Sequence, residues 1–419
     1  MIITILSAGT QGDTQPYIAL GVELKKAGHT VRLAAFEIFE PFVRRFGIEF
    51  VPIKGDISSV ASSADTSSAT KADNPLKLLL SFNKLKSFAF DLQEDFFNAC
   101  KGSDAIVYHP GAAIGFFAAQ YLKIPSILAT PFPMTITSEY PALIFYDKVR
   151  LGRQYNKITH KIFEKIMWFA SSSPVKQFWQ QEFGKTHENF SCPYGKQNTK
   201  TNPTVTSCSN YVFPRPNDWP EHIHNTGYWF LADDAGWEPS NELLDFLQKG
   251  TPPIYVGFGS IGNPAQAGQT TKLVINALKR SGKRGILATG WSGMKKIDHI
   301  PEGIFILESA PHSWLFPRMA AVVHHGGAGT TAAGLKAGVP SIIIPFSNDN
   351  FAWGRRVYEL GVGSKPIPRR KLTEDNLVDA IHDVSANEIQ EAAKDLGMRI
   401  RSENGAERAA QIISDCFLP

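Results

Sequence analysis

The chain has 419 residues, of which 43% are hydrophobic and 20% are charged, and its formal net charge is +4. This length exceeds what one hydrophobic core usually serves, so we expect about two domains. The net charge is small and does not suggest a nucleic-acid-binding protein, which would present a clustered basic face. The four cysteines form no CxxC pair, so they indicate neither a zinc site nor a disulfide framework and favour a reducing, cytoplasmic compartment.

The N-terminal residues 1–13 do not resemble a secretory signal peptide, because they lack a basic region and a long apolar run. No stretch of the sequence approaches the ~18 consecutive apolar residues of a membrane span. We therefore expect no more than peripheral contact with a membrane.

The first half of the chain alternates strand and helix patterns. The β-branched run at 2–7 is typical of a buried parallel strand and leads into Gly9 and Gly12. Helical spacing over 14–28 and an apolar run at 29–36 complete the pattern of a βαβ unit. The same reasoning predicts strands at 103–110 and 125–131 with a helix at 111–123 between them. This order indicates a doubly wound α/β domain.

The middle of the chain is less regular. Residues 56–75 are rich in Ser and Ala and predict a surface loop, while 76–183 carry Phe, Leu and Trp at roughly helical spacing. Residues 184–204 predict a second polar loop. The following stretch, rich in Pro and aromatic residues, has little periodicity and predicts an interdomain linker at 216–240.

The α/β pattern restarts after the linker. An apolar run at 252–260 ends in a glycine turn, and a helix is predicted at 268–282. Further strands are predicted at 284–290, 304–309, 320–325 and 340–346. We therefore predict two Rossmann-like domains, with an N-terminal domain at 1–215, the linker at 216–240, a C-terminal domain at 241–400, and a helix at 401–419 that packs back across the domains.

The stretch AVVHHGGAGTTAAGLKAG, residues 321–338, joins a predicted strand to a predicted helix through two histidines and a run of glycines. A helix N-terminus offers free N–H groups and a partial positive charge, and glycines let a diphosphate approach the backbone. Imidazole adds another donor. The alternative is a tight turn that needs glycine for geometry alone, but histidine beside glycine at a strand end is hard to explain by packing.

A second candidate site is GTQGDTQPY, residues 9–17, which follows the first predicted strand. Open α/β sheets bind ligands at the carboxyl ends of their strands, so Asp13 is a candidate catalytic residue. It is equally a candidate cap for a helix that begins near Pro16. GTQGD does not follow the GxGxxG pattern, so it gives weak support for a nicotinamide-binding fold.

Several of these motifs resemble one known family. The stretch APHSWLFPRMAAVVHHGGAGTTAAGLKAGVPSIIIPFSNDNFAWGRRVYELGVG is similar to the donor-binding segment of UDP-sugar-dependent glycosyltransferases of the GT-B fold. The likeness is greatest to the sterol 3-β-glucosyltransferase branch, with antibiotic glucosyltransferases as relatives. GTQGDTQPYIALG resembles the N-terminal motif of that branch, and NDWPEHIHNTGYWFL, PPIYVGFGSI and TPFPMTITSEYP also match its sequences. The resemblance implies two Rossmann-like domains that face each other across a cleft, and an inverting enzyme without metal or cofactor, for which the UDP-sugar is a co-substrate.

The resemblance also assigns roles to single residues. Asp13 resembles the general base that accepts the proton of the acceptor hydroxyl. The other matching positions are donor-binding residues: Thr10, Gln11 and Gly12 beside Asp13; Ser260 near the diphosphate or uridine; Ser309 and Ala310 beside the uracil; His312, His325, Gly327, Ala328, Gly329 and Thr330 around the diphosphate; and Asp349 and Asn350 at the sugar hydroxyls.

The chain departs from the family pattern at four of its positions. Gln11 stands where the branch usually has Arg, and Ala328 replaces the usual Ser while keeping its backbone N–H. Asn350 replaces the usual Gln and is one methylene shorter, which weakens the expectation of glucose as the donor sugar. Ala333 occupies the place of a ribose-binding Glu in plant enzymes, which favours the sterol and antibiotic side of the family.

The sequence thus predicts an inverting hexosyltransferase that transfers a sugar, with UDP-glucose as the expected donor, to a hydroxyl of a sterol or polyphenol-like acceptor. The alternatives are a macrolide or glycopeptide glycosyltransferase that uses a UDP- or dTDP-sugar, a non-catalytic nucleotide-sugar-binding protein, and a nucleotide-sugar epimerase on the same fold. The acceptor pocket, formed by variable loops, is not legible in the sequence.

Overall fold

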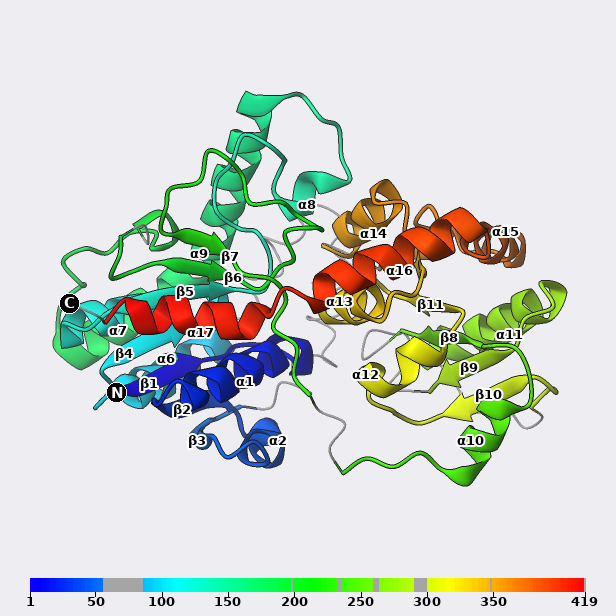
Figure 1. The fold of residues 1–419 in the computed structure, drawn as a ribbon. Helices are drawn as coiled ribbons and strands as arrows, with labels where there is room; N and C mark the ends of the chain where they lie inside the picture. Colours follow the sequence, from blue (N-terminus) through cyan, green and yellow to red (C-terminus); the bar gives the residue numbers. More distant parts are fainter. Residues whose placement is uncertain are drawn as a thin grey trace. The chain divides into compact units, whose positions relative to one another are not determined.

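The computed structural model describes residues 1–55, 86–196, 199–232, 236–258, 264–289, 300–346 and 349–417. The predicted loop at 56–75 and the predicted donor-binding residue Ser260 lie outside these ranges. The chain forms two compact units, drawn in Figure 1. Unit 1 contains Met1–Leu231 and Glu403–Pro419, and unit 2 contains Ala232–Ser402.

Unit 1 is built on a seven-stranded sheet in the order β3-β2-β1-β4-β5-β6-β7. Each neighbouring pair is parallel, as in the register Ile3↔Val31 between β1 and β2. The strands are β1 (Ile2–Leu6), β2 (Thr30–Phe36), β3 (Glu49–Ile53), β4 (Ala105–Tyr108), β5 (Ser126–Thr130), β6 (Thr204–Thr206) and β7 (Ile223–Asn225). Strands covered on both faces by helices need apolar side chains on both sides, which explains the continuous apolar runs of β1 and β4.

The helices of unit 1 pack against this sheet and form one hydrophobic core with it. They are α1 (Gln11–Lys26), α2 (Glu40–Arg44), α6 (Lys86–Cys100), α7 (Ile114–Leu122), α8 (Leu143–Tyr146), α9 (Arg153–Phe183) and α17 (Gly405–Asp415). The longest of them, α9, packs against α6. The helix at the C-terminal end, α17, packs against α1 and places Ala409 and Ile413 in the core of unit 1.

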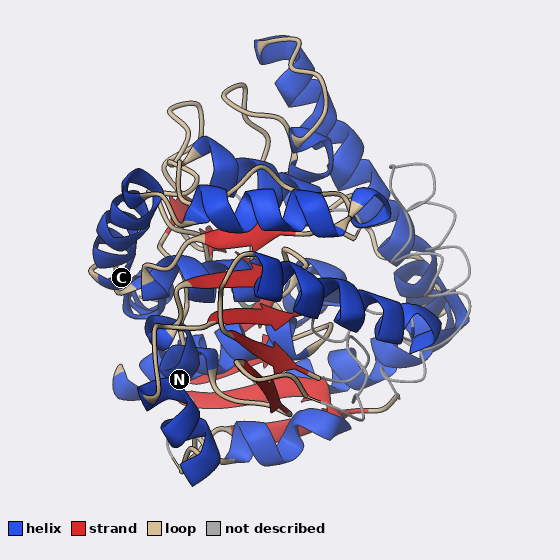
Figure 2. Ribbon diagram, turned by 90° about the vertical axis from the view of Figure 1, so that its right-hand side faces the viewer, coloured by secondary structure: helices blue, strands red, loops and turns tan. Residues whose placement is uncertain are grey.

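Unit 2 has a five-stranded parallel sheet in the order β10-β9-β8-β11-β12. Its strands are β8 (Ile254–Gly257), β9 (Gly285–Ala288), β10 (Ile304–Leu307), β11 (Ala321–His324) and β12 (Ser341–Ile343). Its helices are α10 (Asn241–Gln248), α11 (Pro264–Arg280), α12 (His312–Leu315), α13 (Ala328–Ala337), α14 (Asn350–Glu359), α15 (Glu374–Val384) and α16 (Asn387–Arg401). Apolar clusters lie on both faces of this sheet, and Figure 2 shows strands with helices on either side. The two doubly wound parallel sheets confirm the predicted fold class.

The predicted linker at 216–240 differs from the structure. Unit 1 extends to Leu231, because β7 pairs with β6 through the register Val205↔His224 and completes the sheet. Residues 184–204, predicted as loop, likewise end in the first residue of β6. Both strands have only three residues, too few to show the alternation by which a strand is recognised. Among the described residues, no helix is long and apolar enough to cross a membrane.

Candidate functional site

Asp13 lies at the carboxyl edge of the sheet of unit 1. Helix α1 begins at Gln11, five residues before the predicted start near Pro16, so Asp13 sits in its first turn. Its Oδ2 accepts hydrogen bonds from the Thr10 backbone N–H at 2.8 Å and from the Thr10 hydroxyl at 3.1 Å. These bonds fix the carboxylate and form a capping box in which Thr10 is the N-cap residue and Asp13 the third residue of the helix. Asp13 is therefore not the N-cap of a helix that begins near Pro16, as one reading of the sequence predicts. Both bonds use Oδ2, which leaves Oδ1 as the oxygen that can accept a proton from a ligand.

Gly9 makes this position of Asp13 possible. Its φ is +143°, and a Cβ atom at this position would lie 2.2 Å from Asp13 Oδ2. Any side chain at residue 9 would therefore displace the carboxylate. The predicted residues Thr10, Gln11 and Gly12 are exposed around it in the same turn.

His109 comes next to Asp13 from the end of the neighbouring strand. It follows β4, which pairs with β1 through Leu6↔Tyr108. Its Nδ1 accepts the Gly111 N–H at 2.9 Å, so a neutral His109 carries its proton on Nε2. Burial lowers the pKa of His109, and the Asp13 carboxylate acts in the opposite direction. The ring also meets Tyr17 edge to face, with centroids 5.9 Å apart.

The segment 131–142, which follows β5 at the same edge of the sheet, is held by polar contacts in which Thr137, Ser138 and His160 are buried and Asp218 is exposed. Asp218 accepts hydrogen bonds from the Thr137 hydroxyl at 2.6 Å and the Ser138 N–H at 2.7 Å. The ring nitrogens of His160, in α9, each lie 3.1 Å from a backbone carbonyl oxygen, of Met134 and of Tyr140. The first half of α9 therefore fixes the position of the segment 131–142, which lies at the same edge of the sheet as Asp13.

In unit 2 the HHGG turn follows β11 and leads directly into α13. The first bond within the helix runs from the Thr331 N–H to the Gly327 carbonyl at 2.9 Å. The backbone N–H groups of Ala328, Gly329 and Thr330 come before this bond, so the helix itself offers them no acceptor. This is the arrangement that suits an anion at a helix N-terminus.

Gly326 is required by the packing of this turn. Its φ is +90°, and a Cβ atom there would lie 2.7 Å from Ile343 Cγ2 and 3.0 Å from the Asn350 carbonyl oxygen. The Asn350 side-chain amide in turn donates to the Gly326 carbonyl at 3.3 Å. Gly326 is therefore needed for the geometry of the turn, as the alternative interpretation of the glycines predicts. This requirement does not conflict with binding of an anion at the N–H groups that follow.

The two histidines of the turn differ in their surroundings. His324 is fully buried, and its Nδ1 accepts the Gly326 N–H at 3.1 Å. His325 is buried as well, and its Nδ1 has no hydrogen-bond partner among the described residues. Burial, with a smaller contribution from the neighbouring His312, lowers the pKa of His325 to about 4. The ring is therefore neutral at pH 7. Its other nitrogen, Nε2, lies beside the N-cap of α13, since a Cβ atom on Gly327 would lie 2.5 Å from it.

The other predicted donor-binding residues lie at the carboxyl edge of the same sheet. Ser309 and Ala310 follow β10, and His312 opens α12 with its ring stacked on Phe316 at 4.2 Å between centroids. Asp349 is the N-cap residue of α14, and its carboxylate accepts a hydrogen bond from Trp353 Nε1 at 3.2 Å. Asn350 is buried and contacts Gly326 as described above. The predicted sites therefore form two groups, one at the edge of each sheet.

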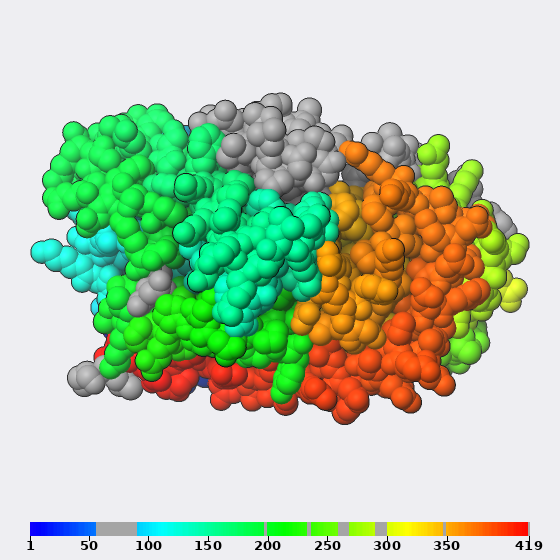
Figure 3. All heavy atoms as spheres, turned by 90° about the horizontal axis from the view of Figure 1, so that it is seen from above, coloured from blue at the N-terminus to red at the C-terminus, as the bar shows by residue number. Residues whose placement is uncertain are grey.

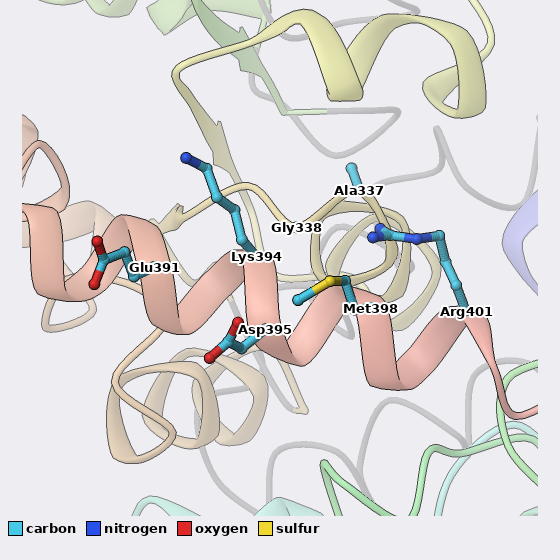
Figure 4. A pocket seen from close by; sticks show the side chains of 7 residues that line it. All are labelled: Ala337, Gly338, Glu391, Lys394, Asp395, Met398 and Arg401. Atoms are coloured by element: carbon cyan, nitrogen blue, oxygen red, sulfur yellow. The ribbon is translucent and has the colours of Figure 1, made fainter.

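A hollow of about 450 Å³ lies elsewhere in unit 2, where α16 passes the C-terminal end of α13 (Figure 4). Its lining residues are Ala337, Gly338, Glu391, Lys394, Asp395, Met398 and Arg401. None of the predicted site residues is among them. Its acidic and basic side chains are present in equal number, so it offers no clear charge selection for a ligand.

Acid is expected to destabilise the protein below about pH 6.5. Burial lowers the pKa values of His324 and His325, so both stay neutral in the folded state while the unfolded chain binds protons near the ordinary value. The unfolded state then binds more protons, and stability falls as the pH drops from about 6.5 to 4. His325 alone accounts for about 3 kcal/mol across this range. Urea unfolding at a series of pH values measures the loss, and a flat profile would contradict buried neutral histidines.

Comparison with known proteins adds a further set of findings. Residues 3–141 match the model of the glycosyltransferase family 28 N-terminal domain, and residues 274–416 match that of the erythromycin biosynthesis protein CIII-like C-terminal domain. A sterol 3-beta-glucosyltransferase of Leptosphaeria maculans is 35% identical over 99% of this chain, which spans 28% of that relative. One of Arabidopsis thaliana is 33% identical over 97% of the chain, which spans 66% of it. The chain is thus shorter than the curated relatives it matches.

Solved structures show the same architecture. The glycotransferase of kitacinnamycin superposes with a TM-score of 0.71 at 18% identity and covers 100% of this chain and 99% of its own. The calicheamicin glycosyltransferase CalG4 gives a TM-score of 0.68, also at 18% identity, and covers 99% of this chain and 98% of its own. At this identity the likeness concerns the fold alone.

Proposed function

We propose that this chain, which belongs to the GT-B-fold glycosyltransferases related to the sterol 3-beta-glucosyltransferases, transfers a sugar from UDP-glucose to the hydroxyl of a sterol or similar hydrophobic alcohol. The observation that carries the proposal is the HHGG turn of unit 2. There Nε2 of His325 lies beside Gly327, the N-cap residue of α13, since a Cβ atom on Gly327 would lie 2.5 Å from it. Such a group of donors suits the diphosphate of a nucleotide sugar. The names of the relatives support glucose and a sterol.

In the proposed reaction Asp13 is the general base. An alcohol is a weak nucleophile, and a carboxylate with an ordinary pKa near ~4 cannot deprotonate it in advance. Oδ1 of Asp13 therefore accepts the proton while the new C–O bond forms, and the sugar–phosphate bond breaks on the opposite face. This gives inversion, so an α-linked donor yields a β-glycoside. The two bonds from Thr10 hold the carboxylate in place during the transfer.

In the proposed reaction unit 2 binds and stabilises the leaving diphosphate. Negative charge grows on the β-phosphate as the bond breaks, and fixed donors lower the barrier most when they already point at that charge. The N–H groups of Ala328, Gly329 and Thr330 and the imidazole of His325 would serve this purpose. We retain Ser309 and Ala310 as neighbours of the uracil, Asp349 and Asn350 as sugar contacts, and His312 as a second histidine at the diphosphate. No metal or cofactor has a role in this scheme.

The test is release of UDP from UDP-glucose, measured with and without a panel of sterols, flavonoids and macrolides. We expect release that depends on a sterol, together with a new β-glucoside identified by mass spectrometry and NMR. Release that depends on a macrolide, or on dTDP-glucose in place of UDP-glucose, would replace the proposal with the antibiotic alternative. Release without any acceptor would indicate an epimerase or hydrolase. Donor binding without release for any pair of substrates would indicate a binding protein.

A further inference from the structure

One exposed surface of unit 1 has no role in the proposed reaction. It is formed by residues 147–152 and the first half of α9. Large apolar side chains are exposed there, with exposed fractions between 39% and 69% for Val149, Leu151, Ile158, Ile162 and Phe169. Soluble proteins expose single apolar residues everywhere, but several of them along one short segment of chain indicate an interaction surface. In Figure 1 α9 begins at the top of the view, and in Figure 3, which looks from above, the teal atoms around residue 150 lie at the surface.

The helical spacing places apolar and cationic side chains on one face. Ile158 and Ile162 are one turn apart, and the exposed Lys161 and Lys165 lie between and beyond them on the same side. The opposite face of the helix is occupied, since Asn156, Thr159 and His160 are buried. The exposed face therefore carries both apolar and cationic side chains, and it is separate from the face that packs against the rest of unit 1.

Basic side chains predominate on this surface. Residues 147–165 contain six basic residues, which are Lys148, Arg150, Arg153, Lys157, Lys161 and Lys165, and two acidic residues, Asp147 and Glu164. Glu164 is buried on the inner side, and burial raises the pKa of its carboxyl to about 7. Asp147 pairs with Lys148 at 2.8 Å, and Asp218 is held by Thr137 and Ser138. Lys161 and Lys165 form no ion pair with any residue in the described part of the chain.

We propose that this surface, residues 147–152 with the exposed face of α9 up to Phe169, docks on a bilayer that contains anionic lipids. Basic side chains near such a bilayer are attracted by its negative surface potential, while Ile, Leu, Val and Phe side chains enter the boundary between headgroups and acyl chains. A purely electrostatic partner such as RNA would not use the apolar side chains. A purely apolar partner would not use the cations.

The position of the surface gives it a use in the proposed reaction. The inner face of the same part of α9 holds the segment 131–142 in place, through the contacts of His160 with Met134 and Tyr140. The segment 131–142 follows β5, which is two strands away in the sheet from β1, the strand that precedes Asp13. Docking would bring this edge of unit 1 to the membrane, where a hydrophobic alcohol acceptor resides. The docking itself does not depend on catalysis, and the surface is a separate claim from the proposed function.

The experiment is flotation of the full chain with phosphatidylcholine vesicles and with vesicles in which about a third of the lipid is phosphatidylserine. We expect binding to the anionic vesicles that weakens as salt is added. Lys161→Glu with Lys165→Glu should lower this binding at least about tenfold, since each charge near the surface contributes about 1 kcal/mol. Ile158→Ser with Ile162→Ser should remove the binding that survives at high salt.

The matched control is Lys249→Glu with Lys279→Glu, which makes the same change of charge at exposed positions of unit 2. It should bind vesicles nearly as the unchanged chain does. Unaltered melting temperatures, and unaltered UDP release with a detergent-dispersed acceptor, would show that the α9 variants fold and work. No binding to anionic vesicles would overturn the proposal. So would equal losses in the control and the α9 variants, or tighter binding to single-stranded RNA that the isoleucine variants leave unchanged.

Discussion

Replacing Asp13 with asparagine is expected to lower turnover by about 10²–10⁴-fold, the usual contribution of a general base. The asparagine side-chain oxygen can still accept the hydrogen bonds from Thr10 that Asp13 Oδ2 accepts at 2.8 and 3.1 Å. Its amide nitrogen, which then takes the place of Oδ1, donates a proton and cannot accept one. The substitution therefore removes the proposed chemistry and keeps the cap.

The chain contains its own demonstration that asparagine suits this position of a helix. In α15 Asn376 stands three residues after the N-cap Thr373 and accepts its backbone N–H at 3.0 Å. We therefore expect Asp13→Asn to unfold within about 0.5 kcal/mol of the unchanged chain in urea. Asn376→Ala is the matched control, which should cost about 1 kcal/mol of stability and leave turnover unchanged. Turnover near that of the unchanged chain in Asp13→Asn would rule out this residue as the base.

Replacing His325 with alanine is expected to weaken the binding of UDP and to lower turnover by about 10²–10³-fold. In the proposed scheme the imidazole is a fixed donor to the β-phosphate, and water that fills its space must be oriented during the reaction. His382→Ala is the control, because His382 is exposed on α15 and lies outside both proposed groups of site residues. Equal turnover of the two variants would remove His325 from the donor site.

Proton uptake gives a second and independent measure of the role of His325. Its pKa is about 4 because the ring is buried, so it is neutral in the unliganded protein at pH 7. A diphosphate placed against it favours the charged ring and raises this pKa. Binding of UDP should then take up a proton, which calorimetry in buffers of different protonation enthalpy detects, and His325→Ala should reduce the uptake. Undiminished uptake in that variant would assign the protonated group to another residue such as His312.

The same variant should change the response of stability to acid. The unpaired imidazole contributes to the loss between about pH 6.5 and 4, so His325→Ala should unfold along a shallower pH profile than the unchanged chain. Alanine at this position also removes a buried polar atom that has no described partner, which limits the cost of the substitution near neutral pH. The variant therefore separates loss of function from loss of fold.

Much of the architecture follows from local patterns that the chain displays openly. The apolar runs of β1, β4 and β11, and the glycines that end them, are long enough to indicate parallel strands and their turns. His325 is predicted because it follows β11 directly, and Asp13 because it lies in the first helical turn after β1. Helix α1 begins earlier than the sequence pattern predicts, because the capping residue three positions into the helix is an Asp where the familiar pattern has Glu or Gln.

Other parts of the site depend on contacts between distant residues and leave no local signal. His109 is ordinary in its own sequence, and it gains meaning only because β4 pairs with β1. His160 occupies the buried side of α9 like many core histidines, and only the folded chain brings both of its nitrogens to carbonyl oxygens of the segment 131–142. The motif predicts that Asn350 contacts the sugar, whereas its contact with Gly326 depends on the close packing of α14 on the turn. These residues illustrate how tertiary pairing adds information that spacing does not hold.

The return of the chain to unit 1 has a consequence for its synthesis. Helix α17 supplies Ala409 and Ile413 to the core of unit 1, and Glu403 accepts the Asn210 N–H at 2.9 Å. A ribosome delivers these residues only after all of unit 2 has been made, at about 5–20 residues per second. The apolar side of α1 therefore has no partner helix until the 171 intervening residues, Ala232–Ser402, have been translated. Unit 2, continuous in sequence, can finish folding first, and the half of the molecule that is made first is the half that is completed last.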